Sequence, residues 1–171
     1  MTAVATTTTT TLTEQQLNLI LQYTVEAYKT FEKLAENVPN PMVAQTFKSF
    51  AVDERDARDL VEMKIIANGS TRVRVTLGGD LLFEDMLRGE LSDREKGEFL
   101  VARERTMMKK LTELSANAGP ADRSLLIYLA SGKRAHIVEL ERELELIKLD
   151  SKWFSREDAQ SRIINGPRVT E

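Results

Sequence analysis

Apolar residues recur at alternating spacings of three and four along four stretches of this chain, the pattern of helices that each bury one face. The stretches run from Thr13 to Val38, from Asn40 to Asn68, from Ser92 to Ala118 and from Pro120 to Asp150. The first stretch has its stripe at Leu17, Leu21, Thr24, Tyr28, Phe31, Ala35 and Val38. We predict four long amphipathic helices.

Three of these stretches begin with residue types that cap helix N-termini. The pairs are Thr13 with Gln16, Asn40 with Pro41, and Ser92 with Glu95. Short turns rich in Pro, Asn or Gly separate the first stretch from the second and the third from the fourth. Each such pair should therefore form an antiparallel hairpin.

The remaining segments differ from the helical stretches. Residues 1–12 are rich in Thr, and we expect a disordered tail. Residues 70–91 form a long crossover, in which 71–77 alternate like a strand, Gly78-Gly79 predicts a turn and Asp80 begins a short amphipathic turn. In the tail at 150–171, Trp153 and Phe154 should fold back on the helices, and residues 155–164 should form a short helix.

Two helical hairpins joined by one long crossover have the connectivity of ferritin-like folds. The predicted fold class is therefore all-α, an antiparallel four-helix bundle over residues 13–149.

Charged residues interrupt three apolar stripes at core positions, namely Glu54, Glu104 and Lys133. The lone histidine, His136, follows Lys133 by one helical turn. A charge on a core face costs several kcal/mol unless it is paired or binds a metal. We predict a buried polar cluster of Glu54, Glu104, Lys133, His136, Thr24 and Tyr28.

Two segments around this cluster resemble motifs of the rubrerythrin and ferritin-like family. Residues 50–61 look like the second-helix motif, with Glu54 as its glutamate and Ala57 where its histidine belongs. Residues 130–140 look like the fourth-helix motif, with Lys133 in place of the glutamate and His136 retained.

Glu104 matches the third-helix glutamate of that family, and the corresponding position of the first helix is Thr24. A di-iron site in this fold takes four carboxylates and two histidines. The resemblance therefore implies a degenerate di-iron site in a protein without ferroxidase or peroxidase activity. Such a protein would act in binding or regulation.

The chemistry of the cluster has three interpretations at this stage. Glu54, Lys133 and Glu104 could form a buried ion triad that neutralises itself, with His136 as a hydrogen-bonded partner and no cofactor. Glu54, Glu104 and His136 could instead bind one iron or manganese ion, in an oxidoreductase or an iron-handling protein. Burial could also lower the pKa of Lys133 and leave a nucleophilic or proton-transferring amine.

Other charged residues are expected outside the core. Asp53 and Asp56 could instead be aligned with the Glu-x-x-His pair of the second-helix motif. At about 100° per residue, however, Glu54 lies nearest the centre of the apolar stripe, and we prefer Glu54. Glu26 points away from its own stripe and is expected to be a solvated surface charge. The run Arg142-Glu143-Glu145 is expected to be a solvated helix face.

Composition narrows the functional classes. Of 171 residues, 42% are hydrophobic and 30% are charged, and the formal net charge of −3 does not favour nucleic acid as a partner. The absence of cysteine excludes thiolate ligands and disulfides. No stretch approaches the ~18 apolar residues of a membrane span, and we expect a cytoplasmic protein with no membrane partner.

A second apolar stripe at Met63, Ile66, Val101 and Met108 predicts a homodimer that associates through helix faces. A purely structural bundle that interacts through its surface and its Trp153/Phe154 tail is a third functional alternative.

Overall fold

The computed structural model describes residues 10–70 and 89–167, and all regular secondary structure within them is helical. The long helices are α1 (Glu14–Asn37), α2 (Pro41–Ala67), α4 (Asp93–Ala116) and α5 (Pro120–Leu149). A 3-10 turn, η1 (Trp153–Ser155), and a short helix, α6 (Ala159–Asn165), follow. The predicted strand-like stretch, glycine turn and short amphipathic turn of the crossover lie outside the described residues, as do residues 1–9 of the predicted tail.

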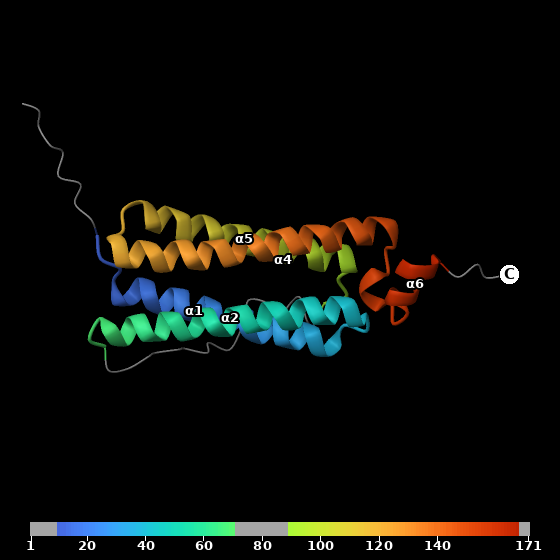
Figure 1. The fold of residues 1–171 in the computed structure, drawn as a ribbon, viewed down its shortest axis with the longest axis horizontal. Helices are drawn as coiled ribbons and strands as arrows, with labels where there is room; N and C mark the ends of the chain where they lie inside the picture. The colour runs from blue at the N-terminus through green and yellow to red at the C-terminus, as the bar shows by residue number, and fades with distance from the viewer. Residues whose placement is uncertain (1–9, 71–88, 168–171) are drawn as a thin grey trace, which may run out of the picture.

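The long helices form two antiparallel hairpins that lie side by side with their axes nearly aligned (Figure 1). Helices α1 and α2 pack closely against each other, and so do α4 and α5. The two hairpins also meet, with direct contact between α2 and α5. The predicted pairing of helices within each hairpin is confirmed.

The predicted helix starts are also confirmed. Thr13 and Gln16 form a reciprocal capping box at α1, and Ser92 and Glu95 form another at α4. Asn40 accepts from the backbone N–H groups of two residues in the first turn of α2. These caps satisfy donors that the first turn of a helix leaves free, and so they define where each helix begins.

The core is divided into two apolar clusters by a polar layer. One cluster contains Phe31, Phe47, Phe50, Leu100, Leu140, Trp153 and Phe154, among others. The other contains Leu17, Leu21, Val61, Ile65, Leu111, Leu126 and Leu129, among others. Each long helix passes from one cluster to the other, and the buried residues at the crossing points are Thr24, Glu54, Glu104, Lys133 and His136.

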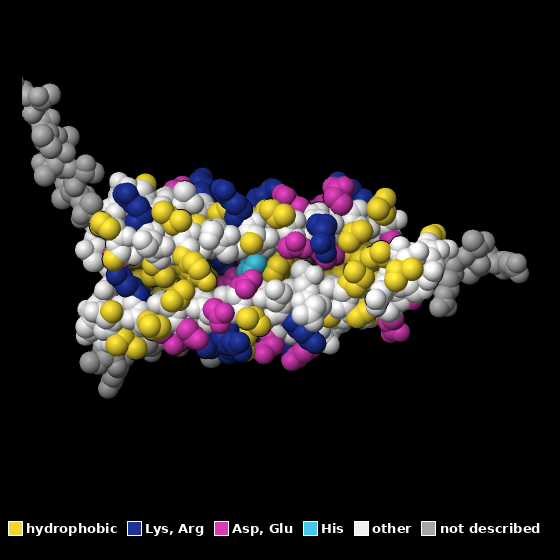
Figure 2. All heavy atoms as spheres, in the orientation of Figure 1, with side chains coloured by type: hydrophobic (Ala, Val, Ile, Leu, Met, Phe, Trp, Pro, Cys, Tyr) yellow, Lys and Arg dark blue, Asp and Glu magenta, His cyan; other side chains and the backbone are white. Residues whose placement is uncertain are grey.

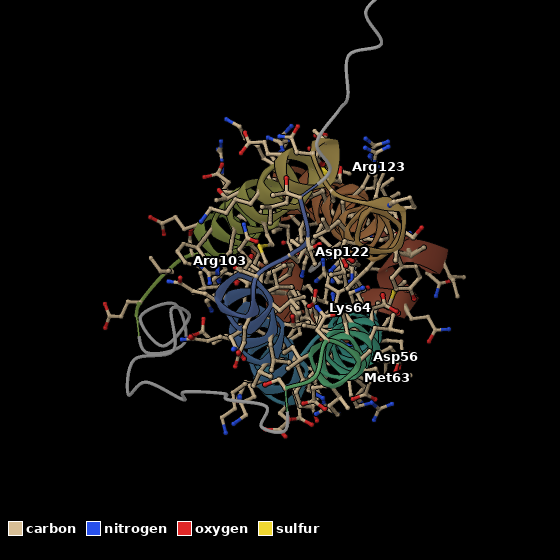
Figure 3. All side chains as sticks on the ribbon, turned by 90° about the vertical axis from the view of Figure 1, so that its left-hand side faces the viewer. Asp56, Met63, Lys64, Arg103, Asp122 and Arg123 are labelled. Atoms are coloured by element: carbon tan, nitrogen blue, oxygen red, sulfur yellow. The ribbon has the colours of Figure 1, made fainter. Side chains whose placement is uncertain are left out.

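The segment before α1 is packed where a disordered tail was expected. Leu12 is buried, and its backbone N–H donates to Asp122 at 2.8 Å. Lys64 of α2 reaches the same carboxylate at 2.6 Å, and in Figure 3 their side chains meet between the hairpins. Residues 10–12 thus belong to the folded part of the chain, because Asp122 and the adjacent turn supply partners for their backbone.

The chain after α5 folds back as predicted, with Trp153 and Phe154 buried. The expectation of a solvated Glu143 was wrong: this residue is buried, and its carboxylate accepts from the Trp153 indole N–H at 2.7 Å. Thr46 of α2 donates to the same carboxylate at 3.4 Å. The predicted helix over 155–164 is observed as the 3-10 turn followed by the shorter α6.

Glu26 was also wrongly placed on the surface. Its side chain is 8% exposed and lies 3.5 Å from the guanidinium of Arg103 on α4. The second apolar stripe divides in two: Val101 is buried in the core and Met108 packs partly buried against it, whereas Met63 and Ile66 are 65% and 59% exposed. None of the described helices combines the length and the apolar character that crossing a bilayer requires.

Candidate functional site

Three helices place the charged residues of the polar layer. Glu54 comes from α2, Glu104 from α4, and Lys133 and His136 from successive turns of α5. All four residues are at most 5% exposed. The helical spacing that predicted a buried polar cluster is therefore confirmed for these four residues.

Lys133 occupies the space between the two glutamates. Its ammonium donates to Glu54 Oε1 in a close ion pair and lies 3.5 Å from Glu104 Oε2. The ring of Tyr23 on α1 is also near, with its centroid 5.2 Å from the ammonium. An ammonium that faces two carboxylates and an aromatic ring has favourable electrostatic partners on each side.

His136 bridges Glu104 and one further carboxylate, that of Asp53. Its Nδ1 lies 3.0 Å from Glu104 Oε2, and its Nε2 lies 3.1 Å from Asp53 Oδ2. A carboxylate can only accept, so both hydrogen bonds are satisfied together when both ring nitrogens carry a proton. The ring also packs on Phe50, with a centroid distance of 4.1 Å, which suits a cationic imidazolium. The geometry favours the charged form of His136.

The pKa values follow from the balance between burial and these partners. Burial alone would lower the pKa of Lys133, but the facing carboxylates of Glu54 and Glu104 outweigh it and raise the pKa above its ordinary value. Burial likewise opposes the charge on His136, yet its hydrogen bonds to Asp53 and Glu104 raise its pKa. Lys133 is therefore held as an ammonium, which argues against the nucleophilic amine.

The two glutamates are supported unequally. Burial raises the pKa of Glu54, and the attraction of Lys133 offsets this only in part. For Glu104 burial also acts upward, but Lys133 and His136 together lower the pKa. One oxygen of each carboxylate, Glu54 Oε2 and Glu104 Oε1, has no hydrogen-bond partner among the described residues.

Thr24 and Tyr28 have different surroundings. Thr24 is buried beside the cluster, and its hydroxyl donates to the Ile20 carbonyl within α1. Tyr28 was wrongly assigned to the cluster, because its hydroxyl donates to Glu32 on the exposed side of α1. Of these two tyrosines of α1, Tyr23 is the one that lies against the cluster, beside Lys133.

Two residues at the site were not predicted: Tyr23 was overlooked, and Asp53 was set aside in favour of Glu54. Tyr23 follows the buried Ile20 by three residues and precedes the buried Ala27 by four, a spacing that places it on the flank of the stripe. Asp53 lies on the flank of α2 and remains 56% exposed, so its stripe position alone did not indicate contact with His136. A residue on the flank of a stripe can thus contact a site that residues at the stripe centre define.

The residues present do not fit a di-iron centre. Ferritin-like di-iron sites have a carboxylate or an imidazole at six positions. At three of the corresponding positions this chain has Thr24, Ala57 and Lys133. The ligand atoms of Glu54, Glu104 and His136 all lie within 4.8 Å of one another, which is a plausible set for one metal ion. A single ion would require the Lys133 ammonium to leave and His136 Nδ1 to lose its proton.

A pocket of about 260 Å³ opens beside the cluster. All four long helices line it, and Figure 2 shows the side chain of His136 through the groove between the hairpins, next to acidic atoms. The cluster therefore forms one wall of a cavity that communicates with solvent.

No protein-family model, curated protein or solved structure matches this chain. The geometry of the site therefore carries the functional proposal.

Proposed function

We propose that this protein is a ferritin-like four-helix bundle, similar to rubrerythrins, in which a metal-free ion cluster stands at the place of the di-iron centre. The protein binds a small ligand, or regulates through such binding, without ferroxidase or peroxidase activity. The observation that carries this proposal is the position of the Lys133 ammonium between Glu54 and Glu104.

The order of the helices supports the fold assignment. Two hairpins with short turns are separated by a longer stretch of chain between Ala67 and Asp93, which is the connectivity of ferritin-like bundles. The polar layer also receives residues from each of the four long helices, as the metal sites in the core of such bundles do. These features favour the ferritin-like family for the fold, and they do not require that the chain carries out di-iron chemistry.

Charge balance supports a metal-free layer. In a di-iron site, metal cations offset the charge of the buried carboxylates. Here the ammonium of Lys133 and the imidazolium of His136 offset the two carboxylates of Glu54 and Glu104. The protein itself supplies the positive charge, so metal binding would have to displace an ion pair that is already formed.

Metal analysis of the purified protein tests this proposal. After expression in medium supplemented with iron and manganese, elemental analysis should find far less than one metal ion per chain. The matched positive control is the triple variant Thr24→Glu, Ala57→His and Lys133→Glu, which restores four carboxylates and two histidines. Binding of about two metal ions per chain by the unmodified protein would refute the proposal.

A second candidate function rests on the proximity of Glu54, Glu104 and His136. A mononuclear iron or manganese site at these residues would indicate an oxidoreductase or an iron-handling protein. It predicts one ion per chain that is lost in His136→Ala. It also predicts tighter binding at higher pH, because the metal competes with the proton on His136.

We also propose that the protein is a homodimer. The side chains of Met63 and Ile66 stay largely exposed, and in Figure 3 Met63 lies on the outside of the hairpin formed by α1 and α2. Light scattering coupled to size-exclusion chromatography should give twice the mass of the chain, and Met63→Lys should reduce it. A monomer at all concentrations would contradict this.

A further inference from the structure

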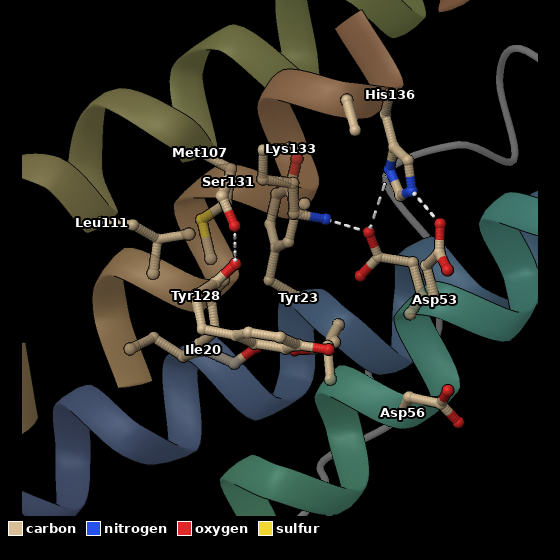
Figure 4. A pocket seen from close by; sticks show the side chains of 16 residues that line it. Ile20, Tyr23, Asp53, Asp56, Met107, Leu111, Tyr128, Ser131, Lys133 and His136 are labelled. Atoms are coloured by element: carbon tan, nitrogen blue, oxygen red, sulfur yellow. Dashed lines mark hydrogen bonds and ion pairs between the residues drawn. The ribbon is translucent and has the colours of Figure 1, made fainter. Parts of the chain in front are cut away.

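The pocket beside the ion cluster has two chemically different ends. Figure 4 shows Ile20, Met107 and Leu111 at one end and Asp53, Asp56 and His136 at the other. Its volume of about 260 Å³ lies below the roughly 300–1,000 Å³ of pockets for drug-sized ligands. The pocket therefore suits a small molecule with one polar and one apolar end.

The polar end carries an excess of negative charge. Asp53, Asp56 and Glu54 line it, and Glu104 lies directly behind. The cations that face these groups are Lys133 and His136, and both are already engaged with carboxylates. Four carboxylates against two cations leave a local surplus of negative charge, which attracts a cationic ligand.

An unpartnered oxygen at this end provides an acceptor. Glu54 is 2% exposed and lines the pocket, and its Oε2 has no hydrogen-bond partner in the described part of the chain. Leaving a buried carboxylate oxygen without a donor is costly. A ligand that brings an N–H donor into the pocket would remove this cost.

Gly132 provides space in the pocket wall. It lies in the interior of α5, where glycine is unfavourable, and a Cβ built on it would meet nothing within 4 Å. Gly132 also lines the pocket. The chain thus keeps a small residue at a position where a larger one would occupy the cavity.

We propose that this pocket binds a small organic ammonium compound with a compact apolar body. The ammonium donates to the oxygens of Asp53 and Glu54, and the apolar body lies toward Met107 and Leu111. This inference rests on the proposed function, because it takes the ion cluster to be free of metal. It adds the chemical class of the ligand.

An anionic ligand would be disfavoured at the same place. Among the described residues that line the pocket, Lys133 is the only lysine or arginine, and its ammonium is directed at Glu54 and Glu104. An anion placed near it would also lie close to Asp53 and Asp56, which line the same pocket. Charge therefore discriminates between ligands of equal size and shape.

Three probes of similar shape test the proposal by isothermal titration calorimetry: benzylammonium, benzyl alcohol and benzoate. The unmodified protein should bind benzylammonium at one site per chain and bind benzoate at least about tenfold more weakly, the difference expected for a charge-assisted hydrogen bond. Benzyl alcohol should fall between the two. Equal affinities, tightest binding of benzoate, or no binding of benzylammonium would overturn the proposal.

Two variants locate the binding site. Asp56→Asn removes a charge from the polar end, and Gly132→Leu fills the cavity, so each should weaken benzylammonium binding by about tenfold or more. Asp59→Asn is the matched control, since Asp59 lies on the same helix, pairs with Arg58 and does not line the pocket. Retained affinity in Gly132→Leu, with a native circular dichroism spectrum, would overturn the location.

Metal analysis of the same samples separates the two proposals. Protein with negligible metal that fails to bind benzylammonium would refute the ligand class and leave the metal-free cluster intact. Protein with stoichiometric metal would refute the proposed function itself.

Discussion

The ion cluster makes a quantitative prediction about Lys133. In Lys133→Ala, the carboxylates of Glu54 and Glu104 face each other in the core, where both are at most 2% exposed. Glu54 also loses the donor to its Oε1, while its Oε2 already lacks one among the described residues. Removing one partner of a buried ion pair costs about 3–5 kcal/mol, and we expect a loss of this size in the free energy of unfolding.

A charge-balanced variant separates this electrostatic cost from the loss of packing. Lys133→Met combined with Glu54→Gln and Glu104→Gln keeps similar volumes and removes all three charges, so its loss should be much smaller. Lys133→Met alone should resemble Lys133→Ala, because it fills the space but leaves both carboxylates unpaired. The difference in the free energy of unfolding between the Lys133 single variants and the triple variant therefore measures the cost of the unpaired charges more than the loss of packing.

Urea denaturation followed by circular dichroism measures these differences, provided that the dependence on urea concentration is the same in all variants. The loss in Lys133→Ala should shrink as the pH is lowered toward 5, because burial raises the pKa of Glu54 and a protonated carboxyl no longer repels its neighbour. Equal small losses in Lys133→Ala and in the triple variant would show that the groups are solvated, and would refute the reasoning.

Three further predictions concern other parts of the structure. His136 is the lone histidine, so NMR titration of its ring should give a pKa above 6.5, and the pKa should fall in Asp53→Asn. Its contribution to stability should be complete below pH 6.5 and should be lost as the pH rises through the raised pKa. An unshifted pKa would contradict the bridged geometry. Trp153→Phe removes the indole N–H that donates to the buried Glu143 carboxylate at 2.7 Å, and it should lower the free energy of unfolding by about 1–3 kcal/mol, as measured by urea denaturation. An unchanged urea midpoint would mean that water replaces the indole N–H. Gly132→Ala should raise the free energy of unfolding by up to about 1 kcal/mol, since nothing lies within 4 Å of the added methyl group; a decrease would show that the space is occupied.

The sequence predicted the helices because their signals are local. Capping residues such as Thr13, Asn40 and Ser92 and the spacing of apolar residues act within a few turns, and the structure follows them. The same periodicity located Glu54, Glu104, Lys133 and His136 in the core, since a residue at the centre of an apolar stripe is buried whatever the partner helix supplies.

The predictions of side-chain burial were wrong where the burial of a residue depends on another part of the chain. Glu26 and Glu143 lie off the centre of their stripes, yet Arg103 and Trp153 cover them from elsewhere in the chain. Tyr28 occupies a stripe position but turns its hydroxyl outward to Glu32. Helical periodicity gives the direction of a side chain and does not say what approaches its flank.

Polar pairs also recur along the line where α2 meets α5. From one end to the other they are Thr46 with Glu143, Glu54 with Lys133, and Lys64 with Asp122. The helices run in opposite directions, and each step along α2 is matched by a similar step back along α5. Sliding one helix by a single turn, about 5.4 Å, would break all three pairs at once, whereas apolar side chains could find new neighbours. These pairs therefore set the register in which the two hairpins dock, and that register keeps the pocket and the ion cluster at the same level.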